Sequence, residues 1–171
     1  MDNGDGTATL SGTASNAEVG GHSVVLEVSD GNLSDTQNFT ITVTNTNDAP
    51  VATADSFTVN EGSTTNLDLA TNDTDVDDGL DPTSIAIVGV PSNGSIVVNA
   101  DGTVDYTHDG SETVADSFTY TIDDLAGVSS NTVTVNLTID PVNDAPIHSV
   151  PAAQSTPGNT PLVFSSLNGN A

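Results

Sequence analysis

The chain of 171 residues contains no cysteine, no lysine and no arginine. Without cysteine it can form neither a disulfide framework nor a Cys-based zinc site. The missing cations exclude a nucleic-acid-binding protein, because basic side chains are needed to displace the counterions of the phosphate backbone. They also exclude a helix lying on an anionic membrane, which needs Lys or Arg beside its apolar stripe.

Long apolar runs and aromatic side chains are also rare. No apolar stretch approaches the roughly 18 residues of a membrane-spanning helix, so we expect no membrane insertion. No basic segment precedes an apolar core, as it does in a secretory signal peptide. The aromatic residues comprise no Trp, two Tyr and four Phe. We expect Phe57, Phe118, Tyr106 and Tyr120 to fill a protein core rather than to bind a ligand.

Acidic residues, by contrast, are abundant. Asp and Glu number 24, and the formal net charge is -24. Like-charge repulsion destabilises a compact state. Apolar residues nevertheless make up 35% of the chain and form short alternating runs, which favours a half-buried sheet over disorder. A folded chain of this composition needs a bound counter-charge, and oxygen ligands favour Ca²⁺ over Zn²⁺ or copper.

The sequence repeats with a period of 96 residues. The tetrapeptide Asn-Asp-Ala-Pro begins at Asn47 and again at Asn143 (143 − 47 = 96), and the same offset aligns Gly62 with Gly158. A period of this length corresponds to one β-sandwich domain of roughly 100 residues. We therefore expect the C-terminal half of one repeat, a complete repeat and the N-terminal strands of a further repeat, at 1–48, 49–144 and 145–171.

Between the two tetrapeptides the sequence alternates strand patterns with turn residues. The segments 116–122 and 130–139 alternate apolar and polar residues with period two, so each places one face on a core. Asn93-Gly94 and Asp101-Gly102 supply the residues that hairpin turns require. No segment has a helical period. The predicted strands are 51–59, 65–69, 83–90, 94–99, 103–107, 116–122 and 130–139.

Several motifs resemble those of cadherin-like repeats, both dystroglycan-type and bacterial, in bacterial surface proteins and repeats-in-toxin adhesins. They are the two Asn-Asp-Ala-Pro linkers, Val59-Asn60-Glu61-Gly62, the acidic loop 72–79 and the segment 116–120; residues 3–50 resemble the latter half of a dystroglycan-type repeat. The resemblance implies an all-β fold of cadherin/Ig-like Greek-key β-sandwich repeats in tandem. It also implies a secreted or cell-surface bacterial protein with a calcium-dependent structural or adhesive role.

The resemblance further implies metal sites at the junctions between repeats. It places the acidic loop near the linker that enters the complete repeat, where we expect Asp30 of the preceding repeat to reach it. We expect Asp124 to join the linker residues of the second junction, and one or two ions to bind at each junction. Solvated turns remain the alternative interpretation of these acidic clusters. The predicted Ca²⁺ ligands are Asp30, Asn47, Asp48, Asp73, Asp75, Asp77, Asp78, Asp124, Asn143 and Asp144.

Catalytic machinery is not evident. The histidines His22, His108 and His148 are scattered, and we expect them to be ordinary surface residues. No serine lies in a Gly-x-Ser-x-Gly elbow. We therefore expect no enzymatic activity, and the alternative function is a carbohydrate-binding module of a secreted polysaccharide-associated protein.

The two half repeats are expected to expose unpaired strand edges. Such edges are templates for strand addition. The expected partner is therefore a second copy of the chain, by head-to-tail strand complementation into a fibre, or an adjacent repeat of the same chain. A polysaccharide or a cell-surface ligand is the further expected partner.

Overall fold

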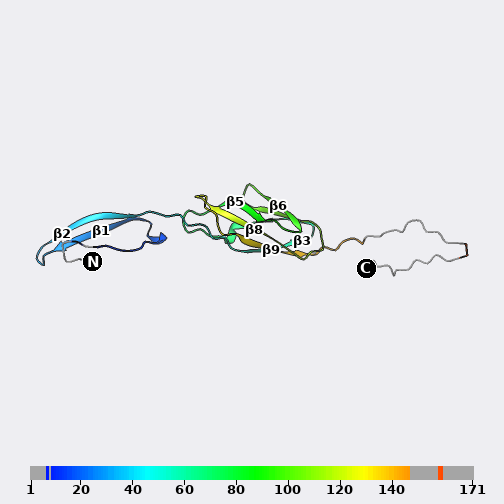
Figure 1. The fold of residues 1–171 in the computed structure, drawn as a ribbon, viewed down its shortest axis with the longest axis horizontal. Helices are drawn as coiled ribbons and strands as arrows, with labels where there is room; N and C mark the ends of the chain where they lie inside the picture. Colours follow the sequence, from blue (N-terminus) through cyan, green and yellow to red (C-terminus); the bar gives the residue numbers. More distant parts are fainter. Residues whose placement is uncertain (1–6, 8, 147–157, 160–171) are drawn as a thin grey trace.

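The computed structural model describes residues 7, 9–146 and 158–159. A two-stranded hairpin of β1 (Gly20–Ser29) and β2 (Ser34–Val43) precedes a seven-stranded sandwich, with the linker 44–50 between them (Figure 1). The two 3-10 turns are short, at Asn16–Glu18 and Ala70–Asn72. Within the described ranges no helix is long and apolar enough to cross a membrane. Most of the further repeat expected at 145–171 lies outside the described residues.

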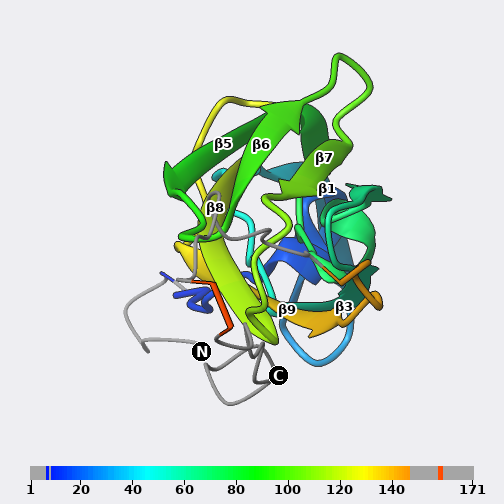
Figure 2. The same cartoon turned by 90° about the vertical axis from the view of Figure 1, so that its right-hand side faces the viewer.

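The sandwich consists of two sheets. One sheet has the order β3-β9-β8-β5, and the other has the order β4-β7-β6. Figure 2 looks along the long axis and shows β3, β9, β8 and β5, the four strands of the first sheet. The strands are β3 (Asp55–Asn60), β4 (Thr64–Leu67), β5 (Leu80–Gly89), β6 (Gly94–Val98), β7 (Val104–His108), β8 (Ala115–Asp124) and β9 (Val133–Asp140).

Each predicted strand overlaps one strand of the sandwich, so the predicted all-β sandwich is confirmed. The first strand begins later than predicted, at Asp55, because the residues before it are bonded elsewhere. Val51 forms an isolated bridge with Thr74, and the Ala52 amide donates to the side chain of Asn131. β3 then pairs in parallel with β9, whereas the other ladders are antiparallel.

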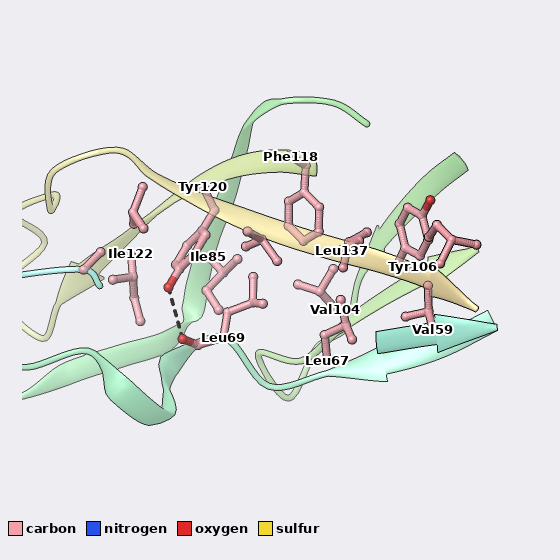
Figure 3. Close-up of a cluster of buried hydrophobic side chains, with 14 residues drawn as sticks. Val59, Leu67, Leu69, Ile85, Val104, Tyr106, Phe118, Tyr120, Ile122 and Leu137 are labelled. Carbon is pink, nitrogen blue, oxygen red and sulfur yellow. Dashed lines mark hydrogen bonds between the residues drawn. The ribbon is translucent and has the colours of Figure 1, made fainter. Parts of the chain in front are cut away.

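The core follows the period-two alternation of the strands. In β9 the side chains of Val133, Val135, Leu137 and Ile139 are buried, and the residues between them are exposed. Strands β7 and β8 contribute further buried residues, among them Tyr106, Phe118 and Tyr120, as the sequence predicts (Figure 3). Phe57 is half-buried and packs against the edge of this cluster. The aromatic residues of the sandwich are therefore core residues.

The hairpin repeats the pattern of β8 and β9 without a covering layer in the part of the chain that the structure describes. Phe39 and Ile41 correspond to Val135 and Leu137 at the 96-residue offset. Phe39 is 43% exposed and Ile41 is 36% exposed, whereas Val135 and Leu137 are 0% and 2% exposed. The cross-strand partner of Phe39, Val24, lies on the same face. The segment 10–14 lines a pocket with Ile41 and Val43 at one end of this face. The hairpin thus presents an open apolar face, which the chain covers only in part.

Candidate metal centres at the two poles

Three carboxylates gather at the pole of the sandwich where the linker from the hairpin arrives. They are Asp75 and Asp78, from the loop between the second 3-10 turn and β5, and Asp124, the last residue of β8. One oxygen of each lies within 4.8 Å of the others. We call this group the Asp75 cluster.

The local structure leaves one oxygen of Asp75 without a partner. Its Oδ1 accepts the backbone N–H groups of Asp77, Asp78 and Gly79 at 2.9, 3.0 and 2.9 Å. These bonds lower the pKa of Asp75, and the one from Gly79 has the largest effect on it. Its Oδ2 is buried and has no hydrogen-bond partner among the described residues. A buried carboxylate oxygen without a partner is unfavourable unless a cation or a water satisfies it.

In the same cluster, the charge of Asp124 affects the ionisation of Asp78. Asp124 is buried, its Oδ1 accepts the Val128 N–H at 2.7 Å, and this bond lowers its pKa. Desolvation, and then the negative charge of Asp124, raise the pKa of Asp78. Two ionised carboxylates therefore disfavour the ionisation of the third, and a bound cation would reverse this effect.

The linker residues Asn47 and Asp48 lie against the same pole. The Asn47 side chain donates to Asp124 Oδ2 at 2.7 Å, and the Asp48 amide donates to Asp77 Oδ2 at 2.5 Å. Asn16, from the segment before β1, donates to Asp48 Oδ2 at 2.9 Å. The structure thus brings together six of the predicted ligands: Asn47, Asp48, Asp75, Asp77, Asp78 and Asp124.

A second group of carboxylates lies at the opposite pole, where the chain leaves β9. Glu61, Glu112 and Asp144 place one oxygen each within 4.8 Å of one another. Glu61 is buried, and its Oε2 accepts the N–H of Val142 in the outgoing linker at 3.0 Å. The charge of Glu61, ahead of effects from Asp144, raises the pKa of Glu112. We call this group the Glu61 cluster.

The structure places three of the predicted ligands elsewhere than expected. Asp30 lies at the tip of the hairpin, whereas the linker follows Val43 at the other end of β2, nine residues or roughly 30 Å along the strand. Asp73 points into the sandwich, where its Oδ1 accepts the Thr53 N–H at 2.7 Å and its Oδ2 accepts the Tyr120 hydroxyl at 2.9 Å. Asp124 belongs to the first pole rather than the second, because β8 runs antiparallel to β9 and ends where β9 begins.

The sequence reasoning also missed two residues of the second pole. Glu61 lies in the motif Val59-Asn60-Glu61-Gly62, and its position one residue beyond β3 is the available signal. Glu112 follows β7 by four residues and carries no local signal. Of the predicted ligands at this pole, Asp144 joins the cluster. The Asn143 side chain instead donates to the backbone oxygen of Asp144 at 3.1 Å.

The donor sets fit a hard divalent cation. Ca²⁺ prefers carboxylate, carbonyl and water oxygens, and both clusters consist of carboxylates beside linker backbone. The chain has no Lys or Arg with which these carboxylates could pair. At the first pole the unpartnered Asp75 Oδ2 adds a specific place for a positive ligand. Asp75, Asp78 and Asp124 would hold one ion, and Glu61, Glu112 and Asp144 another.

The sandwich and the acidic clusters at its two poles define a cadherin-like module. The chain belongs to the bacterial cadherin-like domain family, which matches residues 47–141, more than half of the 171 residues. Human protocadherin-24 EC1-2 is similar in fold, with a TM-score of 0.54 and 15% identity over 77% of this chain and 70% of that one. The expected cadherin-like fold is thereby confirmed.

Endo-fucoidan hydrolases of glycoside hydrolase family 107 also match, with lower TM-scores than the protocadherin. The endo-fucoidan hydrolase MfFcnA4 of glycoside hydrolase family 107 aligns with a TM-score of 0.40 and 24% identity over 77% of this chain. The alignment covers 20% of the hydrolase, so this chain spans about a fifth of its length. No curated protein matches the chain.

Proposed function

We propose that the chain is a calcium-binding structural and adhesive module of a secreted or cell-surface bacterial protein, without catalytic activity. The family supports an extracellular module of this kind. The single observation that carries calcium binding is the Asp75 cluster, in which a buried oxygen lacks a partner beside two further carboxylates. The bonds from Asn47 and Asp48 place the linker on the same pole. A bound ion would therefore fix the linker as well as the loop.

The test is thermal unfolding with calcium and with a chelator. An ion that binds only the folded state adds about 2.7 kcal/mol per site at a concentration 100-fold above its dissociation constant. For a domain of this size each kcal/mol raises Tm by roughly 4–8 °C. An equal rise produced by NaCl at the same ionic strength would instead indicate general screening of the negative charge, and would contradict a specific site.

The variant Asp78→Asn tests the first pole separately, because it removes one carboxylate of the Asp75 cluster. Asp78 is exposed, and its raised pKa indicates that its negative charge is unfavourable in the absence of an ion. We expect Asp78→Asn to leave the Tm in chelator unchanged or higher, and to remove about half of the calcium-induced rise. The matched control is Asp68→Asn, which changes the net charge equally at an exposed position in neither cluster. A full calcium response in Asp78→Asn would rule out this site.

We further propose that another cadherin-like segment covers the open apolar face of the hairpin, in a head-to-tail contact between copies. The supporting observation is that the equivalent face of β8 and β9 is buried beneath the second sheet. Sedimentation in calcium is the measurement. We expect the parent protein to associate as its concentration rises, and Phe39→Ser to abolish this association. A monomer at all concentrations would contradict the contact.

A further inference from the structure

His108 is a buried histidine whose side chain hydrogen-bonds to the residues that follow the two glutamates of the Glu61 cluster. It is the last residue of β7 and is 2% exposed, so the expectation of a surface histidine is wrong for this residue. Its backbone N–H donates to Ser63 O at 3.0 Å. His22, by contrast, is exposed as expected.

The hydrogen bonds of the ring define its tautomer. Nδ1 accepts two backbone N–H groups, those of Gly62 and Gly110, each at 3.2 Å. A nitrogen that accepts these bonds carries a lone pair, so the ring proton lies on Nε2. Nε2 therefore donates to Thr113 Oγ1, which is 3.0 Å away.

These bonds reach the residue that follows each glutamate, at the Gly62 backbone on one side and at the Thr113 side chain on the other. Gly62 follows Glu61 directly, and Thr113 follows Glu112 directly. Gly62 adopts a positive φ of 64°, in a turn closed by the bond from Ser63 N to Asn60 O at 3.2 Å. One buried ring thus links the turn that carries Glu61 to the loop that carries Glu112.

We propose that His108 is a positioning residue, which holds Glu61 and Glu112 at the spacing that a divalent cation requires. This inference rests on the proposed function. Without an ion the carboxylates repel each other, as the effect of Glu61 on the pKa of Glu112 indicates. A tether to the Gly62 backbone and to the Thr113 side chain opposes their separation and reduces the cost of ordering the site when the ion binds. The Asp75 cluster contains no histidine, so it serves as an internal reference.

The experiment measures Ca²⁺ affinity in an Asp78→Asn background, in which the Glu61 cluster is the remaining site. His108→Leu removes both side-chain tethers and is expected to weaken binding about 10- to 100-fold, the usual cost of losing an outer-shell partner. Thr113→Val removes the bond on the Glu112 side, together with the bond between Thr113 Oγ1 and Ser111 Oγ, and is expected to have a smaller effect in the same direction. His108→Asn keeps an acceptor for Gly62 and is expected to restore part of the affinity.

Two comparisons separate positioning from a general loss of structure. With Asp78 intact, His108→Leu and Thr113→Val should leave the affinity of the Asp75 cluster unchanged. In chelator, the Gly62 amide should exchange its hydrogen faster in His108→Leu than in the parent protein. If His108→Leu does not fold, Thr113→Val decides alone.

An unchanged affinity in the folded variants, or an equal loss at both clusters, would overturn the role of His108 and leave the proposed function intact. If the Asp78→Asn protein and the parent protein both fail to bind Ca²⁺, the proposed function and the positioning role fail together.

Discussion

The stability of the sandwich should depend on the protonation of Asp55. The Tyr120 hydroxyl lies 3.1 Å from Asp55 Oδ2 and 2.9 Å from Asp73 Oδ2. It also lies 3.0 Å from Leu69 O, the bond drawn in Figure 3. It has one proton to donate to three acceptors. Asp55 and Asp73 are each 7% exposed, so water does little to satisfy the acceptors that do not receive the Tyr120 proton. A proton on Asp55 would supply the missing donor.

Burial raises the pKa of Asp55 from 3.8 to about 6. The bond from Tyr120 opposes this rise, and the negative charges of Asp73 and Asp68 add to it. The folded state therefore holds a proton that the unfolded chain releases at lower pH. The stabilisation is complete below pH 4 and is lost as the pH rises to about 6. At 1.36 kcal/mol per pH unit, the loss is at most about 3 kcal/mol, and solvent screening reduces it to about 1–3 kcal/mol.

The variant Asp55→Asn imitates the protonated carboxyl group. At pH 7 we expect it to raise the free energy of unfolding by about 1–3 kcal/mol, and to flatten the pH dependence between 4 and 6. Urea unfolding in chelator, at several pH values, measures both effects. A variant that is less stable than the parent at pH 7 would refute the reasoning.

The matched control is Asp116→Asn, at the other aspartate–tyrosine pair. Asp116 Oδ2 accepts the Tyr106 hydroxyl at 2.9 Å. Although burial opposes the effect, bonds from the N–H groups of Ser92, Asn93 and Ser117 lower its pKa. Its charged form is the stable one, so Asp116→Asn should destabilise the fold at pH 7, by about 1–2 kcal/mol.

Two further substitutions test the packing. A Cβ at Gly94 would lie 2.6 Å from Thr107 O and 2.7 Å from the Tyr106 ring. Gly94→Ala should therefore lower the urea midpoint by the equivalent of about 1–3 kcal/mol. An unchanged midpoint would contradict the close approach. Leu137→Ala should cost about 2–5 kcal/mol, and Ile41→Ala at the equivalent hairpin position less than about 1 kcal/mol. Equal costs in thermal melts would show that the hairpin face is covered.

The sequence predicted those features that depend on short-range pattern. The alternation of 130–139 identified β9 and the residues that it buries, because period two separates the two faces of a strand. The Asn-Asp linker and the acidic loop identified the first pole. The same reasoning applied to 72–79 did not separate Asp75, which turns to the cluster, from Asp73, which turns into the core.

Features that depend on chain direction in space were not predictable in this way. The sequence neighbours of Asp124 suggested the second junction, but the antiparallel turn between β8 and β9 places it at the first. The scattered histidines predict a surface residue at His108, but period two along β7 buries it together with Val104 and Tyr106. The three members of the Glu61 cluster come from segments far apart in the sequence, so only the fold reveals their proximity.

The parallel pairing of β3 with β9 determines how the sandwich responds to mechanical tension along the chain. These are the first and last strands of the sandwich, and they pair from Asp55 opposite Val135 to Asn60 opposite Asp140. Because both run in the same direction, pulling the segment before Asp55 away from the segment after Asp140 slides one strand along the other. The whole ladder is then loaded in shear at once, instead of opening one bond at a time, so a string of such modules would resist extension until an entire ladder ruptures.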